Sequence, residues 1–235
     1  MPSNDFIVPF CNSPVRILYT DQQLLFVDKP SGLLSVPGKH PANKDCLISR
    51  VQLGENLVHD GSNDIQSGYP EARIVHRLDM DTSGVMVVAL NADCHRALSR
   101  QFEQRQTEKH YRAVVYGVIE NDEGRIELPI IGDWPNRPLQ KICTDTGKPA
   151  LTDYQVLSRN RTDNSSQLLL KPVTGRSHQL RVHLAAIGHP ILGCSFYAHS
   201  QALASSARLL LHASLLTLTH PISGKAITIN CPAPF

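Results

Sequence analysis

The chain has 235 residues, 41% of them hydrophobic, and a formal net charge of +2, which suits a globular protein long enough to bury a sizeable core. A charge this close to neutral excludes a uniformly basic surface, so any case for nucleic-acid binding must rest on local clusters of cations. The six cysteines lie far apart without a CxxC pair, no long hydrophobic leader precedes them, and no apolar run approaches the roughly 18 residues of a membrane span. These features predict a cytoplasmic protein with reduced thiols and no membrane partner.

The first part of the chain predicts an arm and a pair of strands. Residues 1–16 lack a clear hydrophobic period and are expected to form an N-terminal arm that is poorly ordered or lies along the surface. The next stretch, ILYTDQQLLFVDKP, predicts two short strands around a polar turn, and Pro30 and Gly32 end the second. Residues 30–44 are typical of a loop, and residues 52–69, rich in Gly, Asn, Asp and Ser, predict a surface excursion.

The stretch RIVHRLDMDTSGVMVVAL, residues 73–90, places a carboxylate between two predicted strands, at residues 72–76 and 84–90. The second strand is apolar on both alternating faces, which is typical of a central strand covered on both sides. Asp79 beside such a rigid strand is a candidate site. An ordinary turn capped by Asp79 or Asp81 explains the same stretch equally simply.

A helix follows from Asn91, its expected N-cap, to about Gln106, with an apolar stripe that includes Leu98 and Phe102. Its outer face and the residues after it hold a local excess of cations: Arg96, Arg100, Arg105, Lys109 and Arg112. A solvated helix exterior has the same composition, so this face is either an RNA contact or an ordinary surface.

The remaining chain is rich in strands, expected at residues 110–119, 125–130, 148–157, 167–171, 209–218 and 225–230. One helix is expected from Ser177, its predicted N-cap, to Ile187, ended by Gly188 and Pro190. Short links between strands predict an α+β fold with a mixed, largely antiparallel sheet and a few flanking helices.

Most motifs of enzyme chemistry are missing. No GxGxxG follows a strand, and no phosphate loop, HExxH or GxSxG occurs, so nucleotide-dependent, zinc-hydrolase and serine-hydrolase functions lose their usual support. Arg176 and His178 belong to a cluster of Gly, Arg and His from Lys171 to His183 around the start of the second helix. Such a cluster fits an RNA-backbone or anion site, and it fits a structural network of ion pairs equally well.

Four motifs in one order carry a family resemblance. His76-Arg77-Leu78-Asp79, followed by Thr82-Ser83-Gly84 and an apolar strand, resembles the catalytic signature of the RluA-type pseudouridine synthases. The three flanking motifs agree in order and spacing: Lys29-Pro30-Ser31-Gly32-Leu33, Lys109-His110-Tyr111, and Thr174-Gly175-Arg176 leading to Arg181-Val182-His183. Together they identify the chain, from about Ile17 to its C-terminus, as similar to this family.

The resemblance implies a pseudouridine synthase fold, with a bent sheet and a central active-site cleft. Residues 17–235 are then a single catalytic domain, which could comprise two lobes, with no separate S4-like RNA-binding domain. Residues 133–138 and 146–150 resemble the small subgroup that acts on both a large-subunit (23S) ribosomal RNA hairpin and the anticodon stem-loop of certain tRNAs. The long segment between Gln52 and Tyr69 departs from that subgroup and leaves the details of the substrate open.

The implied reaction isomerises uridine to pseudouridine in RNA without a cofactor or a metal. Asp79 is expected to be the nucleophile or a charge-stabilising carboxylate, and Arg181 the cation that keeps it ionised. Tyr111 resembles the family's active-site tyrosine, suited to stacking on uracil and to proton transfer through its hydroxyl. Attack at the base, attack at the sugar and elimination through a glycal all stay open.

Several further residues are expected to bind the substrate. Arg77 resembles the family residue that fills the space left when the target uridine leaves the stack, at an unstacking cost of a few kcal/mol. The other expected contacts to RNA are His76, Arg176, Lys171 and Thr82. The expected partners are ribosomal and transfer RNA stem-loops, bound by a monomer through splayed bases and backbone.

Two other classes of function remain as alternatives. A non-catalytic RNA-binding or RNA-folding factor would share the fold, but the presence of Asp79, Tyr111 and Arg181 together argues against it. A glycosidase also uses a carboxylate at an anomeric carbon, but the sequence offers no convincing acid and base pair.

Overall fold

The computed structural model describes residues 6–59 and 67–235, which divide into two compact units. The N-terminal unit holds the described residues up to Lys109 together with residues 213–234, and the central unit holds residues 110–212 and Phe235. Within the described ranges, no helix combines the length and the apolar character needed to cross a membrane.

The N-terminal unit is built on a sheet with one strand, β5, at its centre. Its strands lie in the order β3 (Leu57–His59), β1 (Val15–Thr20), β2 (Leu24–Lys29), β5 (Ser83–Ala89) and β12 (Leu211–Thr219), with β4 (Arg73–Ile74) also paired to β5 and β13 (Ala226–Asn230) to β12. The β1–β3 pair is parallel, whereas β1–β2, β2–β5, β4–β5 and β12–β13 are antiparallel. All seven residues of β5 are buried, as its sequence predicts for a central strand.

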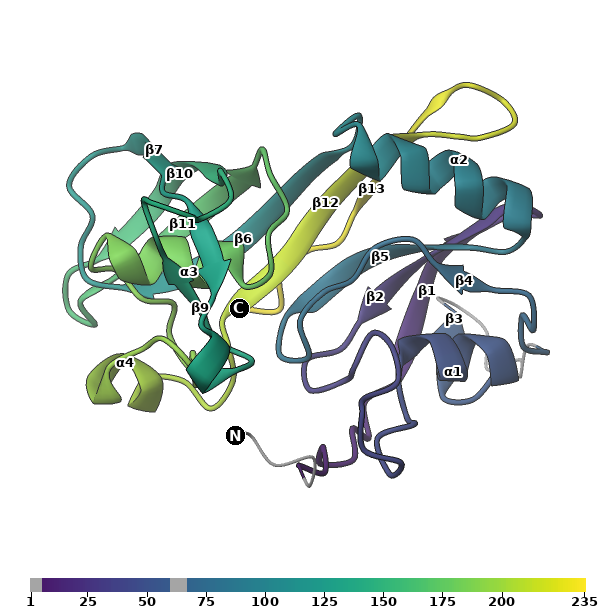
Figure 1. Ribbon diagram of the computed structural model, residues 1–235, viewed down its shortest axis with the longest axis horizontal. Helices are drawn as coiled ribbons and strands as arrows, with labels where there is room; N and C mark the ends of the chain where they lie inside the picture. The colour runs from purple at the N-terminus through teal and green to yellow at the C-terminus, as the bar shows by residue number, and fades with distance from the viewer. Residues whose placement is uncertain (1–5, 60–66) are drawn as a thin grey trace. The chain divides into compact units, whose positions relative to one another are not determined.

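Two helices belong to this unit. The helix α2 (Ala92–Glu103) packs on β4 and β5 (Figure 1), and its predicted N-cap is confirmed because the Asn91 side chain accepts a hydrogen bond from the backbone of Cys94 at 2.8 Å. The shorter helix α1 (Leu47–Leu53) was not predicted. It starts at Cys46 without a side-chain cap and ends at Gly54 in the left-handed conformation, with Leu47 and Val51 buried.

The central unit has its own antiparallel strands, in the order β6 (Glu108–Tyr116), β11 (Ser165–Pro172), β10 (Leu151–Asn160) and β7 (Glu123–Glu127). A small separate pair, β8 (Ile130–Gly132) and β9 (Gln140–Ile142), flanks the 3₁₀ turn η1 (Trp134–Asn136). The helices are α3 (Gln179–Ala186) and α4 (Ser200–Ala204), of which the sequence predicted only the first.

The start of α3 corrects the sequence prediction. His178 is the N-cap and takes the left-handed conformation with φ 54°, so the predicted cap Ser177 lies outside the helix. The amide oxygen of Gln179, rather than a serine hydroxyl, accepts the backbone N–H of Arg176 at 2.9 Å. Six consecutive residues of α3, Gln179 to Leu184, are buried, so the helix is covered on every side and not only along one apolar stripe.

The mixed, largely antiparallel sheet with few flanking helices is confirmed. The expected surface excursion at residues 52–69 contains the end of α1 and strand β3, and its residues 60–66 lie outside the described part of the chain. The central cleft stays a prediction.

Candidate active site

Asp79 lies half-buried on the loop between β4 and β5, and this loop is fastened to an earlier segment of the chain. The Ser35 hydroxyl donates to the Leu78 carbonyl at 2.8 Å and accepts the Leu78 N–H at 3.2 Å. The carbonyl of Asp79 itself accepts the N–H of Thr82 at 3.1 Å, which closes a tight turn. The backbone on both sides of the carboxylate is therefore held.

Lys29 at the end of β2 provides a second fastening from inside the protein. Its side chain is fully buried, and the ammonium donates to the carbonyls of Pro30, Leu33 and Met80 at 2.7 to 2.9 Å. A buried ammonium is tolerated only where it is hydrogen-bonded in this way. Since Met80 follows Asp79 directly, the charge of Lys29 helps to fix the position of the candidate carboxylate.

The backbone of the segment after Lys29 repeats this pattern. The N–H of Gly32 donates to the Met80 carbonyl at 2.9 Å, and the Ser31 hydroxyl donates to the Asp81 carbonyl at 2.7 Å. Gly32 has φ +85°, a conformation that favours glycine. The run Lys29 to Gly32, which carried part of the family resemblance, thus supports the Asp79 loop along its length.

His76 supports the loop at its other end. Its Nε2 accepts the backbone N–H of Val87 in β5 at 3.1 Å, and its ring stacks on Phe102 of α2 with centroids 4.5 Å apart. Burial, together with the nearby positive charge of Lys109, lowers the pKa of His76 to about 3. The imidazole is therefore neutral at physiological pH and acts here as an acceptor.

The other candidates of this loop differ in exposure. Arg77 points into solvent, whereas Thr82 is buried and Asp79 is intermediate. An exposed arginine next to a half-buried carboxylate suits the predicted division of roles. Thr82 supports the loop through its backbone N–H, which donates to the Asp79 carbonyl, and its predicted contact with the substrate stays a prediction.

The central unit carries the remaining candidates. Tyr111 lies on β6, on the strand face that includes the buried residues Ala113 and Val115. Its backbone pairs with Leu170 of β11, and the next residue, Lys171, is exposed. Arg176 follows on the loop before α3, where its Nε donates to the Pro149 carbonyl at 3.2 Å.

Arg181 occupies the middle of α3 and is only 2% exposed. Its Nε donates to the Cys194 sulfur at 3.4 Å, and its guanidinium lies 4.9 Å from the ring centre of Phe196 and 5.6 Å from that of Tyr197. Aromatic faces stabilise a buried guanidinium and fix its plane. The charge is thus pre-oriented within the central unit.

Polar side chains around α3 form a closed hydrogen-bond network. The Gln179 amide accepts from Thr174 at 2.7 Å and donates to the Leu151 carbonyl and the Thr152 hydroxyl, both at 3.0 Å. The Thr152 hydroxyl also meets His183 Nδ1 at 3.0 Å, and His183 Nε2 meets the Leu128 carbonyl at 2.9 Å. Burial lowers the pKa of His183, so the network is neutral and locks the turn before Arg181.

The cations expected on and after α2 are present, but their surroundings do not distinguish an RNA contact from an ordinary helix surface. Arg96 is exposed and already paired with Asp93, as on an ordinary helix surface. Lys109 is half-buried, and burial together with the neighbouring Arg105 lowers its pKa. Contact of this face with RNA stays a prediction.

Sequence reasoning assigned no role to the supporting residues Ser35, Gln179, Phe196 and Tyr197. The aromatic pair of this set follows Cys194 by two and three residues in the sequence. Single serine and glutamine residues carry no pattern that separates a buried network from an ordinary surface.

Comparison with known proteins identifies the class. The family model described as RNA pseudouridylate synthase matches residues 23–186, about 70% of the chain, so the chain belongs to this family. The solved structure of human RNA Pseudouridylate Synthase Domain Containing 1 is 29% identical, covers 97% of this chain and 87% of its own, and superposes with a TM-score of 0.75. The predicted enzyme class, an isomerase that converts uridine to pseudouridine in RNA, is confirmed.

The similarity extends to a particular subgroup. The chain is 53% identical to "Dual-specificity RNA pseudouridine synthase RluA" of Yersinia pestis over 219 residues, which cover 93% of this chain and 99% of the relative. It is 52% identical to the protein of the same name from Escherichia coli K12, again over 219 residues and 93% of each chain. The predicted resemblance to the RluA-type family and to this subgroup is therefore confirmed.

Proposed function

We propose that the protein isomerises specific uridines in structured RNA loops, with Asp79 as the reacting carboxylate. The observation that carries this proposal is the support of the Asp79 loop, which Lys29, Ser31, Ser35 and His76 hold through buried or half-buried hydrogen bonds. A reacting group gains rate when its position is fixed before the substrate arrives.

The reaction breaks the bond between N1 of uracil and C1′ of the ribose and forms a bond from C5 to the same carbon. Asp79 adds to the base or the sugar, or stabilises positive charge at C1′ while the base turns, and elimination through a glycal stays open beside these paths. The proton leaves C5 after the new bond has formed, and N1 gains a proton. Tyr111 is proposed to stack on uracil and to move one of these protons, and Arg181 to keep the carboxylate ionised.

The target uridine must leave the base stack before its glycosidic bond can be reached. Arg77 is exposed beside Asp79 and is proposed to fill the vacated space. Lys171 and Arg176 are proposed to contact the RNA backbone, and His76 and Thr82 to support the loop from below the substrate. The His76 ring accepts the Val87 N–H and Thr82 is buried, which supports this role, and the predicted contact of these two residues with RNA stays a prediction.

The proposed substrates are a 23S ribosomal RNA hairpin and the anticodon stem-loop of tRNA, which would agree with the dual specificity in the relatives' names. We further propose that the protein acts as a monomer in the cytoplasm, where its six cysteines, all thiols in the structure, would stay reduced.

Mapping pseudouridines in the RNA of cells with and without the gene tests the choice of substrate. The proposal expects the loss of at least one site in ribosomal RNA and one in tRNA, and their return when the gene is restored. Loss confined to one of the two RNA classes would contradict dual specificity. An unchanged map would contradict the proposed substrates altogether.

A further inference from the structure

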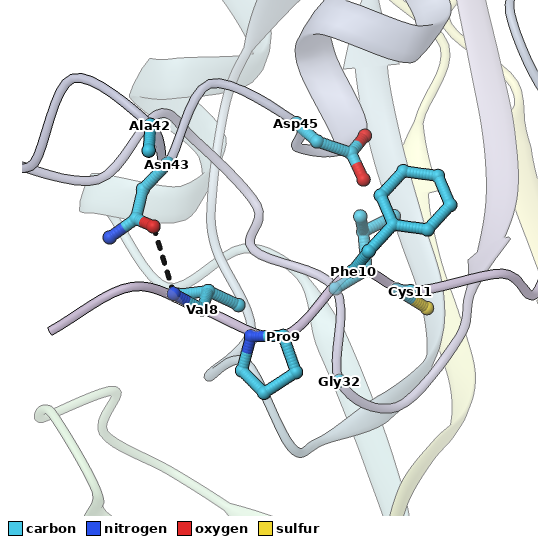
Figure 2. A pocket seen from close by; sticks show the side chains of 9 residues that line it. Val8, Pro9, Phe10, Cys11, Gly32, Ala42, Asn43 and Asp45 are labelled. Atoms are coloured by element: carbon cyan, nitrogen blue, oxygen red, sulfur yellow. Dashed lines mark hydrogen bonds between the residues drawn. The ribbon is translucent and has the colours of Figure 1, made fainter.

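The side chain of Asn43 holds the N-terminal arm to the N-terminal unit. Its amide makes hydrogen bonds to the arm backbone like those that a neighbouring strand would make. The Asn43 amide accepts the N–H of Val8 at 2.9 Å and donates to the carbonyl of Phe6 at 2.8 Å, and Figure 2 shows the first of these bonds. Asn43 itself is buried. The arm backbone is therefore held in one conformation although it belongs to no strand.

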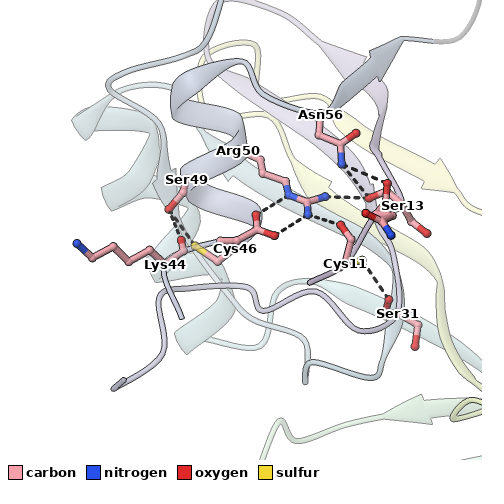
Figure 3. Close-up of polar contacts among 10 residues, drawn as sticks. Cys11, Ser13, Ser31, Lys44, Cys46, Ser49, Arg50 and Asn56 are labelled. Carbon is pink, nitrogen blue, oxygen red and sulfur yellow. Dashed lines mark hydrogen bonds and ion pairs between the residues drawn. The ribbon is translucent and has the colours of Figure 1, made fainter. Parts of the chain in front are cut away.

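A buried arginine fastens the second half of the arm. Arg50, 3% exposed, donates to the carbonyls of Cys11 and Ser13 while its guanidinium makes a two-pronged ion pair with Asp45 at 2.7 Å (Figure 3). Hydrogen bonds from a charged donor are the strong ones. The arm is thus an ordered part of the unit between residues 6 and 13.

This ordered backbone holds aromatic side chains out in solvent. Phe10 is 71% exposed and Phe6 61% exposed, although both stand on fixed backbone. The guanidinium of Arg50 lies 5.7 Å from the centre of the Phe10 ring and orders it from one side. Folding alone gains little from a phenylalanine that stays in water.

Phe10 lies at a cavity of about 130 Å³ between the arm and the rest of the unit (Figure 2). The arm contributes Pro9 and Phe10, and the opposite side comprises Asn43 and Asp45. Gly32 forms part of its lining and donates its N–H to Met80, the residue after Asp79. The cavity is therefore next to the segment that supports the catalytic loop.

Exposed cations close to Asn43 in the chain favour a polyanion. Lys39 and Lys44 are exposed on the same loop as Asn43, and Asp45, the carboxylate among the described residues that line the cavity, is already paired with Arg50. Proteins bind single-stranded nucleic acid by combining cations for the backbone with aromatic rings on which bases stack.

We propose that Phe10 and the cavity beside it bind a splayed base of the RNA substrate, next to the uridine that reacts, with Lys39 and Lys44 at the phosphates. The proposal rests on the proposed function, because it takes the substrate to be an RNA loop held at Asp79. It adds a base-binding site outside the catalytic loop, which would contribute to the choice of RNA.

Kinetics of a matched set of variants test the site on a substrate hairpin. Phe10→Leu keeps an apolar side chain but removes the ring, so the KM should rise roughly 5- to 150-fold, the range for loss of one stacked base. Phe10→Trp should restore the KM, and the kcat at saturating RNA and the thermal midpoint should stay unchanged in both. Ile222→Ala, which removes an apolar side chain that is also 71% exposed, is the control and should leave the KM as it is. An unchanged KM in Phe10→Leu would overturn the proposal.

A binding measurement separates this site from the catalytic proposal. The chain has one tryptophan, Trp134, so the double variant Trp134→Phe, Phe10→Trp reports fluorescence from position 10 alone. Stacking of a base should quench this emission when a short single-stranded oligoribonucleotide is added, and Lys39→Glu with Lys44→Glu should weaken the effect and its salt dependence. Quenching without formation of pseudouridine would support the base site at Phe10 and contradict the proposed function. Formation of pseudouridine without quenching would support the proposed function and contradict the base site.

Discussion

His76 supports the loop that carries Asp79, the proposed reacting group, because its Nε2 accepts the backbone N–H of Val87. Its ordinary pKa is near 6.5 and its folded-state pKa is about 3, so between these values the unfolded chain binds one more proton than the folded one. The stability from the neutral ring is therefore complete above about pH 6.5 and is lost as the pH falls toward 3.

We predict that the free energy of unfolding falls toward acid pH with a contribution from His76 of up to about 1.4 kcal/mol per pH unit. His76→Gln keeps an acceptor for the Val87 N–H and removes the titration, so its stability should depend less on pH in this range. Chemical denaturation of both proteins between pH 7 and pH 4.5 measures the difference. Equal slopes would show that the bond to Val87 does not depend on a neutral ring.

The buried ammonium of Lys29 is expected to contribute to both stability and turnover. Lys29→Met leaves the carbonyls of Pro30, Leu33 and Met80 without their donor, so stability should fall by about 2–4 kcal/mol and turnover should fall with it. Lys225→Met changes an exposed lysine of the same unit and should be neutral. Denaturation midpoints that move equally in the two variants would contradict the role assigned to the buried ammonium.

Residue roles could be predicted from the sequence only where a motif carried them. Asp79, Tyr111 and Arg181 stood in motifs that resemble a family, whereas an isolated Asp79 was equally consistent with a plain turn. The bonds of Ser35 and His76 depend on chain segments that meet only after folding. No local pattern predicts such partners.

At the scale of elements, β5 depends on the close approach of β12. Gly84 has φ +115°, and a Cβ atom there would lie 2.2 Å from the carbonyl oxygen of Ala213 on β12. The backbone of the two strands therefore leaves no room for a side chain at this position. Since β5 follows the Asp79 loop directly, its position sets that of the loop.

We predict that Gly84→Ala costs about 3–5 kcal/mol, from crowding against β12 added to the strain of a positive φ. Gly224→Ala is the matched control, because Gly224 also has a positive φ but a Cβ atom there would meet nothing within 4 Å. It should cost about 1–2 kcal/mol. Similar losses in both variants would show that strain alone, and not the approach of β12, requires glycine at position 84.

The elements with a clear period were predictable, and the short ones were not. β5 and α2 have a continuous apolar run and a capped apolar stripe, and both were found where expected. The helix α1 has seven residues and no side-chain cap, so it is too short to show a clear helical period. The cap of α3 was placed at Ser177 because serine is a common N-cap, but the left-handed backbone at His178 makes the turn instead.

For the whole molecule, the order of four motifs predicted the family and the enzyme class, and composition alone predicted neither. A net charge of +2 argued against a uniformly basic surface, yet the chain belongs to a family that acts on RNA. RNA affinity in such a protein rests on local groups, among which we place Arg77, Lys39, Lys44 and the ring of Phe10. The assignment of the chemistry to Asp79 is the central claim.

Conversion of uridine in a substrate hairpin by Asp79→Asn, compared with Asp81→Asn, tests that claim most directly. Both substitutions replace a carboxylate by an amide of the same shape, two residues apart on the same loop. We predict that Asp79→Asn binds the hairpin with near wild-type affinity and forms no pseudouridine, whereas Asp81→Asn keeps turnover within about tenfold of wild type, since loss of a charge outside the reacting set changes the barrier by less than about 1.4 kcal/mol. Pseudouridine formed by Asp79→Asn at the wild-type rate, or abolished equally by both substitutions, would contradict the account.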